Sequence, residues 1–521
     1  MVREHNIRQL KSSEETWDFI IIGGGATGLG IAVDAASRGF KTVLLEQSDF
    51  AKATSCRSTK LVHGGVRYLQ KGDVMLVREA LRERGRLLHN APHLVKNQRF
   101  IIANYRWWEK PFYTIGLTMY DWLSGSLGLG RSLPMSKKKL LKAIPQILQK
   151  GLRGGVVYHD GQFDDARLAV NLAQTASEYG AVVVNYAKVT GLLKKGKKVS
   201  GVLVRDEIDG EKFELKGCCV VNATGIFVDD IIKMDNNDAV PLVRPSQGIH
   251  LVVDRSFLGG DDAIMVPKTS DGRVLFGVPW HNRVILGTTD TPMKEFVLEP
   301  KPLEEEIEFV LKTSAVYLAR PPKREDVLCV FAGLRPLAAP KRNADETKTK
   351  EISRSHKLIS SESGLITITG GKWTTYRQMA QETVDLCIKK SELTFKPCIT
   401  KNMPIHGYKR TTDNSNWLYV YGSDGDKILA LQNEKPEYAE SLHHKFDFTV
   451  AMVVWAVREE MAQTVDDVLA RRVRALYLDA RASKEMAPKV ADIMAQEMGK
   501  DDAWKKNQLD MFFEIAEGYI L

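Results

Sequence analysis

The residues best suited to chemistry begin with a glycine-rich hexapeptide near the amino terminus. Gly23, Gly25 and Gly28 fit the pattern G-x-G-x-x-G, with Ala26 and Thr27 before the last glycine. In this pattern the first glycine allows a tight turn, and the second lets the backbone approach a pyrophosphate. The third lets a helix pack closely on a strand. The amino terminus of the following helix then attracts negative charge, so the hexapeptide predicts a dinucleotide site.

The elements around the hexapeptide have the order that a dinucleotide site requires. Residues 19–22 predict a strand, residues 26–38 a helix, and residues 41–46 a second strand. Glu46 stands 23 residues after Gly23, where an acidic side chain binds ribose hydroxyls and disfavours a 2′-phosphate. NADP is therefore disfavoured, whereas FAD and NAD both stay open.

The rest of the chain predicts a second sheet and a helical end. We expect no regular structure before Asp18. Strand signals recur at 181–185, 189–193, 201–205 and 217–222. Further strand signals, expected to form an antiparallel sheet that floors a substrate site, lie at 249–253, 263–267, 274–278 and 284–288. From about Asn402 the pattern becomes helical, with helices expected near 445–460, near 464–478 and after 484.

Composition narrows the function classes. The 521 residues suit two or three domains, and 44% hydrophobic with 27% charged residues is typical of a globular protein. The net charge of +9 favours an anionic partner, such as a phosphorylated substrate, an acidic membrane or nucleic acid, or else reflects a basic surface. The six cysteines show neither CxxC nor zinc-ligand spacing, so we expect reduced thiols and no metal. Residues 1–17 resemble neither a signal nor a transit peptide, and no apolar run is long enough to span a bilayer, so any membrane contact is expected from one side.

Residues 106–122 have an unusual aromatic content. The segment reads RWWEKPFYTIGLTMYDW, and the basic stretch 137–142 follows it. Aromatic residues beside Lys and Arg suit a bilayer interface, where rings sit at headgroup level and cations meet anionic lipid. A hydrophobic helix packed on the core explains the same residues, and the sequence leaves both interpretations open.

A family resemblance decides between the cofactors. Residues 53–69 (ATSCRSTKLVHGGVRYL) closely resemble the signature of FAD-dependent, aerobic, quinone-linked glycerol-3-phosphate dehydrogenases. Further blocks resemble the same family in the same order: VNATG at 221–225, ILGTTD at 285–290, FAGLRPL at 331–337 and TGGKWTTYR at 369–377. The resemblance covers most of residues 18–480. No calcium-binding loop of D-x-[DN]-x-[DN]-G form follows Thr400, so it does not extend to mitochondrial members that carry such a module.

The resemblance implies an α/β, multidomain fold. Its parts are an FAD-binding Rossmann-like domain of glutathione-reductase type, an inserted antiparallel β-sheet substrate domain and a C-terminal helical domain. We expect the flavin domain at 17–105, 151–235 and 331–390, the aromatic and basic segment at 106–150, the substrate domain at 236–330 and the helical domain at 400–521.

The resemblance also implies the substrate, sn-glycerol 3-phosphate, and residues that act on it. Its dianionic phosphate needs cations, and the family blocks supply Arg67, Arg335 and Lys372. Arg67 and Arg335 also lie in glycine-flanked, largely apolar surroundings, where an unpaired cation is costly. His250 is the candidate base for the C2 hydroxyl proton, because its ordinary pKa lies close to working pH, although a histidine satisfied within the sheet is the alternative. Tyr68 could donate a hydrogen bond to the substrate.

Other residues of these blocks are expected to contact the flavin. Hydroxyls and an amine can approach ring heteroatoms or phosphate, and glycines allow close approach of the backbone. His63 could orient the isoalloxazine ring. The expected flavin residues, besides the hexapeptide and Glu46, are Ser55, Ser58, Thr59, Lys60, His63, Gly64, Gly65, Ala223, Thr224, Gly225, Gly370, Gly371 and Lys372. No residue stands out as a covalent attachment point, so we expect non-covalent FAD.

The resemblance further implies a quinone acceptor and attachment to the cytoplasmic face of the inner cell membrane, and a homodimer is a further expectation. Two other enzymes of this fold class compete: a soluble, oxygen-using glycerol-3-phosphate oxidase, and an amino-acid oxidase. From another class, an RNA-binding flavoprotein rests on the net charge alone, without an RNA-binding motif, so we expect no nucleic-acid partner.

Overall fold

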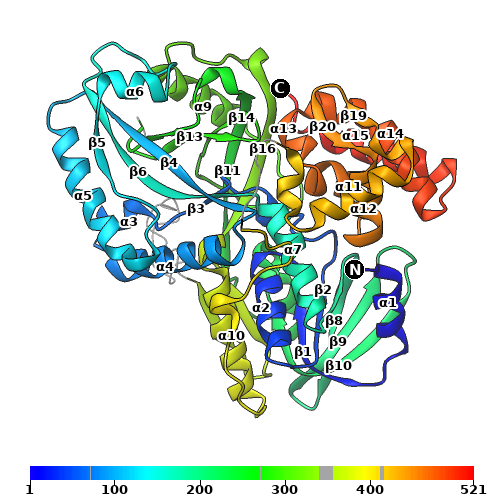
Figure 1. The fold of residues 1–521 in the computed structure, drawn as a ribbon. Coiled ribbons are helices and arrows are strands. Elements are labelled where there is room, and N and C mark those ends of the chain that lie inside the picture. The colour runs from blue at the N-terminus through cyan, green and yellow to red at the C-terminus, as the bar shows by residue number, and fades with distance from the viewer. Residues whose placement is uncertain (71, 270–271, 339–355, 411–415) are drawn as a thin grey trace.

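Two large sheets and a C-terminal group of helices make up the protein. The computed structural model describes residues 1–70, 72–269, 272–338, 356–410 and 416–521, and the side chains of Arg67 and Gln70 lie outside the described parts. Figure 1 shows one sheet at the upper left, the other at the lower right, and the C-terminal helices α11 to α15 at the upper right. This arrangement confirms the expected α/β fold class.

The first sheet contains the strands predicted for dinucleotide binding. Its order is β17-β18-β10-β1-β2-β7, and β8 and β9 extend it from β10. Strands β18, β10, β1, β2 and β7 run parallel, whereas β8, β9 and β17 pair antiparallel. The bounds are β1 (Thr16–Ile22), β2 (Thr42–Leu45), β7 (Val182–Val184), β8 (Ala187–Lys195), β9 (Lys198–Asp206), β10 (Lys212–Asn222), β17 (Lys357–Ser360) and β18 (Ile366–Thr369).

Helices cover this parallel sheet because its strands are apolar on both faces. All four residues of β2 are buried, as in a central strand of a parallel sheet. Helix α2 packs against β1 and β2 on one side and against α7 and α10 on the other. The helices are α1 (Arg3–Ser12), α2 (Ala26–Ser37), α7 (Asp165–Glu178), α8 (Val228–Asp235) and α10 (Tyr376–Lys390).

The second sheet has ten strands and is mostly antiparallel, as predicted. Its order is β15-β11-β14-β13-β12-β4-β6-β3, with β16 beside β11 and β5 beside β6. It also includes β4 and β6, whose residues the sequence analysis assigned to the flavin domain. The domain boundaries therefore stay a prediction. The bounds are β3 (Leu61–Val62), β4 (Val95–Asn104), β5 (Leu133–Ser136), β6 (Gly154–Phe163), β11 (Val243–Asp254), β12 (Ala263–Val266), β13 (Leu275–Trp280), β14 (Arg283–Gly287), β15 (Thr291–Pro292) and β16 (Val327–Ala338).

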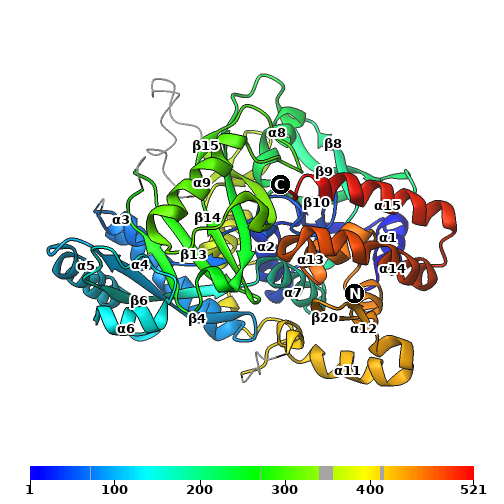
Figure 2. The same ribbon diagram turned by 90° about the horizontal axis from the view of Figure 1, so that it is seen from above.

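Five helices surround the second sheet. Seen from above, α9 lies over β13 and β14, and α5 and α6 lie at the end away from the C-terminal helices (Figure 2). Among the described residues, no helix combines the length and apolar composition needed to cross a bilayer. The helices are α3 (Val66–Gln70), α4 (Val74–Asn90), α5 (Glu109–Ser124), α6 (Lys137–Ala143) and α9 (Glu304–Tyr317).

The C-terminal region is helical but less regular than predicted. The helix expected at 445–460 is wrong at its start, because Phe446–Thr449 forms a strand of a two-stranded hairpin. The helix expected at 464–478 is broken at Arg474, which has a left-handed φ of 66°. The elements are α11 (Asp424–Glu434), β19 (Ser441–His443), β20 (Phe446–Thr449), α12 (Val450–Glu459), a π-helix (Asp467–Arg472), α13 (Ala475–Leu478), α14 (Ala480–Met498) and α15 (Asp502–Glu517).

The expectation that regular structure begins at Asp18 is also wrong. Residues 3–12 form α1, which buries Ile7 and Leu10 against the first sheet. Arg3 is buried and donates to Asp206 at 2.6 Å. The sequence of α1 is rich in charge, so its two apolar contacts gave no clear periodic signal.

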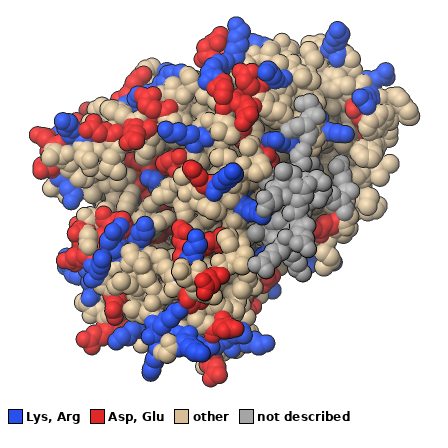
Figure 3. Space-filling view, turned by 180° about the vertical axis from the view of Figure 1, so that it is seen from behind, with Lys and Arg blue, Asp and Glu red and all other residues tan. Residues whose placement is uncertain are grey.

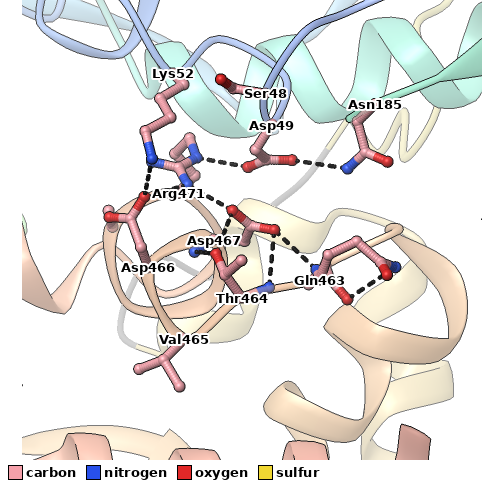
Figure 4. Close-up of polar contacts among 12 residues, drawn as sticks. Ser48, Asp49, Lys52, Asn185, Gln463, Thr464, Val465, Asp466, Asp467 and Arg471 are labelled. Carbon is pink, nitrogen blue, oxygen red and sulfur yellow. Dashed lines mark hydrogen bonds and ion pairs between the residues drawn. The ribbon is translucent and has the colours of Figure 1, made fainter. Parts of the chain in front are cut away.

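A buried charge network joins the C-terminal helices to the flavin-side sheet. Asp49, in the loop after β2, accepts hydrogen bonds from the guanidinium groups of Arg471 and Arg472. Arg471 also donates to Asp466 and Asp467 at 2.7 Å. Figure 4 shows Arg471 lying between Asp49 on one side and the two aspartates on the other. Burial opposes ionisation of Asp49, but the two arginines outweigh it and lower its pKa to about 2.

Removing the Asp49 charge should destabilise the protein. In Asp49→Asn, Arg472 loses its main counter-ion and Arg471 loses one of three, which costs about 3–5 kcal/mol and lowers the thermal unfolding midpoint by roughly 3–5 °C. The control is Asp209→Asn, which removes an exposed partner of Lys11 and should shift the midpoint by roughly 1 °C at most. Equal shifts for the two variants would contradict the role given to the network.

A histidine ties the segment before α11 to α7. His406 Nδ1 lies 2.5 Å from Glu178 Oε1 and its Nε2 lies 2.6 Å from Asp424 Oδ2. Burial lowers the pKa of His406, but the hydrogen bonds with Asp424 and Glu178 outweigh it and raise the pKa to about 9.

This contact should make stability depend on pH. The pKa of His406 is higher in the folded than in the unfolded protein, so the contribution is complete below about pH 6.5 and is lost as pH rises through about 9. We expect His406→Gln to cost about 1–2 kcal/mol at pH 6, after allowance for solvent screening, and little at pH 9.5. Thermal unfolding midpoints of both proteins across this range check it, and a pH-independent difference would contradict it.

Candidate active site

One large cavity lies between the two sheets and contains most of the predicted site. Its volume is about 1220 Å³, above the roughly 300–1,000 Å³ of a pocket for one small ligand. It therefore has room for a dinucleotide and a second molecule. Of the predicted residues, those lining it are Gly23, Gly25, Ala26, Thr27, Glu46, Ser55, Ser58, Thr59, His63, Gly65, Tyr68, Ala223, Thr224, Gly225, His250, Arg335, Gly370, Gly371 and Lys372.

The glycine hexapeptide has the geometry that its pattern predicts. Gly23 has a φ of 109°, and a Cβ there would lie 2.7 Å from the carbonyl oxygen of Ala223. A Cβ on Gly28 would lie 1.9 Å from the carbonyl oxygen of Gly23, so only glycine fits. Gly28 itself lies behind the loop, where it lets α2 approach β1. The amino terminus of α2 thus points into the cavity.

Glu46 occupies the end of β2, as predicted for a ribose-binding acid. Its Oε2 accepts a hydrogen bond from the backbone N–H of Gly24 at 2.6 Å, and its Oε1 accepts one from Ser48 at 2.9 Å. Burial raises the pKa of Glu46, and these hydrogen bonds oppose the rise. The two backbone donors hold the carboxylate at the cavity wall beside the hexapeptide.

Residues 54, 55 and 57–59 line the cavity next to the hexapeptide. Ser55 Oγ accepts a hydrogen bond from the N–H of Ala26 at 3.0 Å, and its carbonyl accepts one from the indole of Trp373 at 2.8 Å. Thr59 Oγ1 lies 2.9 Å from His250 Nε2. This pairing joins two residues predicted separately, one for the flavin and one for catalysis.

Lys60 does not reach the cavity, contrary to its predicted flavin contact. It has a left-handed φ of 60°, and its buried ammonium group donates to Asp165 Oδ2 and to the carbonyl of Cys56, both at 2.6 Å. The aromatic rings of Trp280, Phe331 and Tyr477 surround the ammonium group at 5.1–5.5 Å. Burial lowers the pKa of Lys60 to about 8, with Asp165 opposing the change.

Gly64 is likewise behind the cavity wall. Its N–H donates to the hydroxyl of Tyr120, on α5, at 2.7 Å. Gly65 lines the cavity with a φ of 80°, and the N–H of His63 donates to Thr374 Oγ1 at 3.1 Å. Gly65 at the cavity and Gly64 bonded to Tyr120 therefore connect the cavity wall to α5.

Two of the three predicted cations, Arg335 and Lys372, line the cavity. Arg335 Nη2 donates to Thr288 Oγ1 at 2.9 Å and to the carbonyl of Thr289 at 3.0 Å, which fixes the plane of the guanidinium group. Lys372 Nζ lies 4.1 Å from the ring centre of Tyr68, a cation–π contact. The side chain of Arg67 lies outside the described parts, and its backbone belongs to α3.

His250 is more enclosed than a freely accessible base. Its side chain lies in the sheet on β11, is 2% exposed and stacks on Phe331 with ring centres 4.8 Å apart. Burial, followed by the charges of Arg335 and Lys60, lowers the pKa of His250 well below its ordinary value. The imidazole is therefore neutral at neutral pH, and it is a weaker base than an exposed histidine.

The sequence did not reveal several cavity residues. An apolar part of the wall comes from strands, loops and the start of α4: Leu61, Leu76, Phe100, Tyr158, Met265, Val274 and Phe276. Arg57 also lines the cavity, but its guanidinium group pairs with Glu299 at 2.6 Å. Apart from Arg57 and Leu61, which lie in the 53–69 block, these residues belong to no motif, because only the folding of the chain brings them together. Among the described residues, no group of three or more His, Cys, Asp or Glu side chains could hold a metal ion.

The geometry fits FAD. The hexapeptide can approach a pyrophosphate, Glu46 stands at the ribose position, and the cavity continues past residues 54–65 to Gly370 and Gly371. Both of these glycines have a φ of 78°, a conformation that favours glycine, so no side chain narrows the cavity at these two positions.

Known proteins agree with this cofactor. Residues 18–377 match the family described as FAD dependent oxidoreductase, and residues 365–505 match the C-terminal domain of alpha-glycerophosphate oxidase. The solved glycerol-3-phosphate dehydrogenase of Bacillus halodurans, complexed with FAD, superposes with a TM-score of 0.81 at 28% identity, covering 99% of this chain and 97% of that one. The L-alpha-glycerophosphate oxidase of Mycoplasma pneumoniae shares the fold, with a TM-score of 0.58 at 18% identity, covering 75% of this chain and 99% of that one.

Curated relatives point to the same enzyme class. The chain is 40% identical to the mitochondrial glycerol-3-phosphate dehydrogenase of Bos taurus, covering 98% of this chain and 74% of that protein. It is 38% identical to the mitochondrial enzyme of Schizosaccharomyces pombe, covering 98% and 88%. With the dinucleotide loop, the cation group and these relatives in agreement, the chain belongs to the FAD-dependent glycerol-3-phosphate dehydrogenase family.

Proposed function

We propose that the protein oxidises sn-glycerol 3-phosphate to dihydroxyacetone phosphate and passes the electrons to a membrane quinone. The observation that carries the proposal is the presence of Arg335, Lys372 and the Thr59–His250 pair in the same cavity as the dinucleotide loop. A polyol phosphate needs cations at one end and a proton acceptor at the other, and this cavity supplies both.

The residues divide the work as follows. Arg335 and Lys372 bind the phosphate, and the hydrogen bonds from Arg335 to Thr288 and Thr289 keep its guanidinium group oriented. Tyr68 packs on Lys372 and limits the movement of its ammonium group. Neutral His250 takes the hydroxyl proton. When bound, FAD, which we expect to be held non-covalently, supplies the two-electron oxidation of C2.

Anaerobic titration of the flavin-loaded protein with sn-glycerol 3-phosphate tests the substrate. We expect the oxidised-flavin absorption to bleach, to recover quickly with a quinone analogue and to recover slowly with oxygen. Rapid recovery with oxygen and release of peroxide would support the oxidase instead. Absence of bleaching would contradict the substrate assignment.

The phosphate-binding role has a matched pair of variants. Arg335→Gln removes charge-assisted hydrogen bonds worth about 3 kcal/mol, so kcat/KM for glycerol 3-phosphate should fall about 100-fold or more. Turnover of unphosphorylated glycerol, measured at high concentration as a reference, should change much less. Arg324→Gln makes the same change at an exposed ion pair with Glu304 and should leave both substrates unaffected.

We also propose that α5 attaches the protein to one face of a membrane. Phe112, Ile115, Met119 and Trp122 follow each other at helical spacing and are 48–77% exposed, whereas Leu117 and Tyr120 on the other side are buried. The buried face of α5 packs on the core, and its exposed face carries the aromatic residues that we assign to the bilayer interface.

Charge around α5 suits anionic lipid. Exposed lysines 137, 138, 139 and 142 lie on α6, which packs, like α5, against β5 and β6 (Figure 1). The edge of the molecule on the α5 side, at the right of Figure 3, has few charged side chains. Inside, Tyr120 joins α5 to Gly64 behind the cavity wall, so α5 connects the exposed apolar face with the flavin site. The cytoplasmic face of the cell membrane and a homodimer stay predictions.

Replacing the exposed rings should release the protein from lipid. We expect a triple variant, Trp107→Gln, Phe112→Gln and Trp122→Gln, to lose at least about 100-fold in affinity for vesicles containing anionic lipid, at about 2 kcal/mol per ring. Reduction of a water-soluble quinone analogue should persist. Phe395→Gln, at an exposed ring elsewhere, serves as the control. Unchanged vesicle binding of the triple variant would contradict the role of α5.

A further inference from the structure

The side chain of His250 makes one hydrogen bond among the described residues. Its Nδ1 is enclosed without a hydrogen-bond partner in the described parts of the chain, and Phe331 covers one ring face. The Cδ2 edge faces the backbone of β14, where a Cβ on Gly287 would lie 2.5 Å away. The remaining nitrogen, Nε2, faces Thr59 Oγ1 at 2.9 Å. A proton can therefore reach this imidazole most directly through the Thr59 hydroxyl.

The position of Thr59 is set from behind the cavity wall. The residues on either side of it are both held by Asp165 Oδ2, which accepts from Ser58 Oγ at 2.7 Å and from Lys60 Nζ at 2.6 Å. Asp165 Oδ1 in turn accepts from Arg474 Nη2 at 2.8 Å. With its neighbours anchored away from the cavity, Thr59 presents its hydroxyl between the cavity and His250.

We propose that Thr59 relays the proton from the C2 hydroxyl of the substrate to His250. This inference rests on the proposed function. The substrate O–H bond breaks and its proton joins Thr59 Oγ1, while the proton already on Thr59 moves to His250 Nε2. The electrons of the C2–H bond leave as the hydride that the proposed function assigns to the flavin. Thr59 ends neutral and His250 ends as imidazolium.

The relay explains why a buried polar atom is left without a partner. If Nε2 accepts from Thr59, the neutral ring carries its proton on Nδ1, and burying that N–H unpaired costs about 1–3 kcal/mol. Native proteins keep such groups where function uses them. The charged groups facing His250 are Arg335 on β16 and Lys60 behind the wall, and both disfavour imidazolium. They therefore favour return of the proton through Thr59 once the product has left.

Three variants separate a relay from simple packing. Thr59→Val keeps the shape and removes the hydroxyl, whereas Thr59→Ser keeps the hydroxyl. Thr54→Val removes the hydroxyl of another cavity-lining threonine, which bonds to the carbonyl of Leu334 and not to a histidine. The measurement is the anaerobic, single-turnover rate of flavin bleaching by glycerol 3-phosphate between pH 6.5 and 9, with flavin content checked for each protein.

We expect the wild-type rate to be nearly independent of pH, because His250 stays neutral throughout this range. Thr59→Val should be at least about 100-fold slower at pH 7, and its rate should rise with pH as hydroxide replaces the relay. Thr59→Ser should stay within about fivefold of wild type with a flat profile, since the loss of one methyl group costs only about 1 kcal/mol. Thr54→Val should keep the flat profile. If Thr59→Val does not retain flavin, Thr59→Ala removes the same hydroxyl and takes its place.

Two results would overturn the relay. One is a wild-type rate and profile in the variant without the hydroxyl. The other is an equal, pH-independent loss in Thr59→Val and Thr59→Ser, which would mean that Thr59 only packs. Wild-type protein that does not bleach would instead contradict the proposed function, so the two failures are distinguishable.

Discussion

The buried charge network between the C-terminal helices and the flavin-side sheet is the constraint on which the site depends. Arg471, Arg472 and Arg474 reach from one short segment to Asp49, Asp164 and Asp165 across the interface. Burying these ions carries a large desolvation penalty, which is offset only when every charge is paired with good geometry. The pairing therefore permits one relative position of the C-terminal helices and the cavity wall.

Backbone strain accumulates around the same network. Of the non-glycine residues with left-handed φ, Ala51 lies beside Asp49, Lys60 and Arg474 pair with Asp165, and Tyr186 donates to Asp467. Such conformations cost about 1–3 kcal/mol each and persist where the surroundings over-determine them. Arg471 and Arg472 lie in a π-helix, another irregular conformation within the network. The extra residue in its turn lets the two neighbouring arginines point to the same aspartate, Asp49.

The sequence predicted what is encoded locally. Apolar runs and the glycine spacing located β1, α2 and β2, and most of the site residues predicted from the family blocks line the cavity. Lys60 was misplaced because a motif does not reveal which side chains of a loop face inward, and here Asp165 draws Lys60 away. The Thr59–His250 contact spans 191 positions, and no local pattern records it. The run RRVR at 471–474 resembles a charged helix surface, and only the structure shows that its arginines are buried.

The buried charge network also helps to hold the wall of the cavity, which in the proposed function separates a polar reactant from an apolar one. In the proposed function a phosphorylated polyol needs fixed cations, whereas the proposed quinone would approach from the exposed apolar side of α5. The wall between these sides is the segment from residue 54 to residue 65: Asp165 anchors its start through Ser58, and Tyr120 anchors its end through Gly64. The first anchor is backed by the C-terminal arginines, and the second belongs to α5. Because both anchors hold the same backbone, a displacement of α5 would act directly on the wall that carries Thr59.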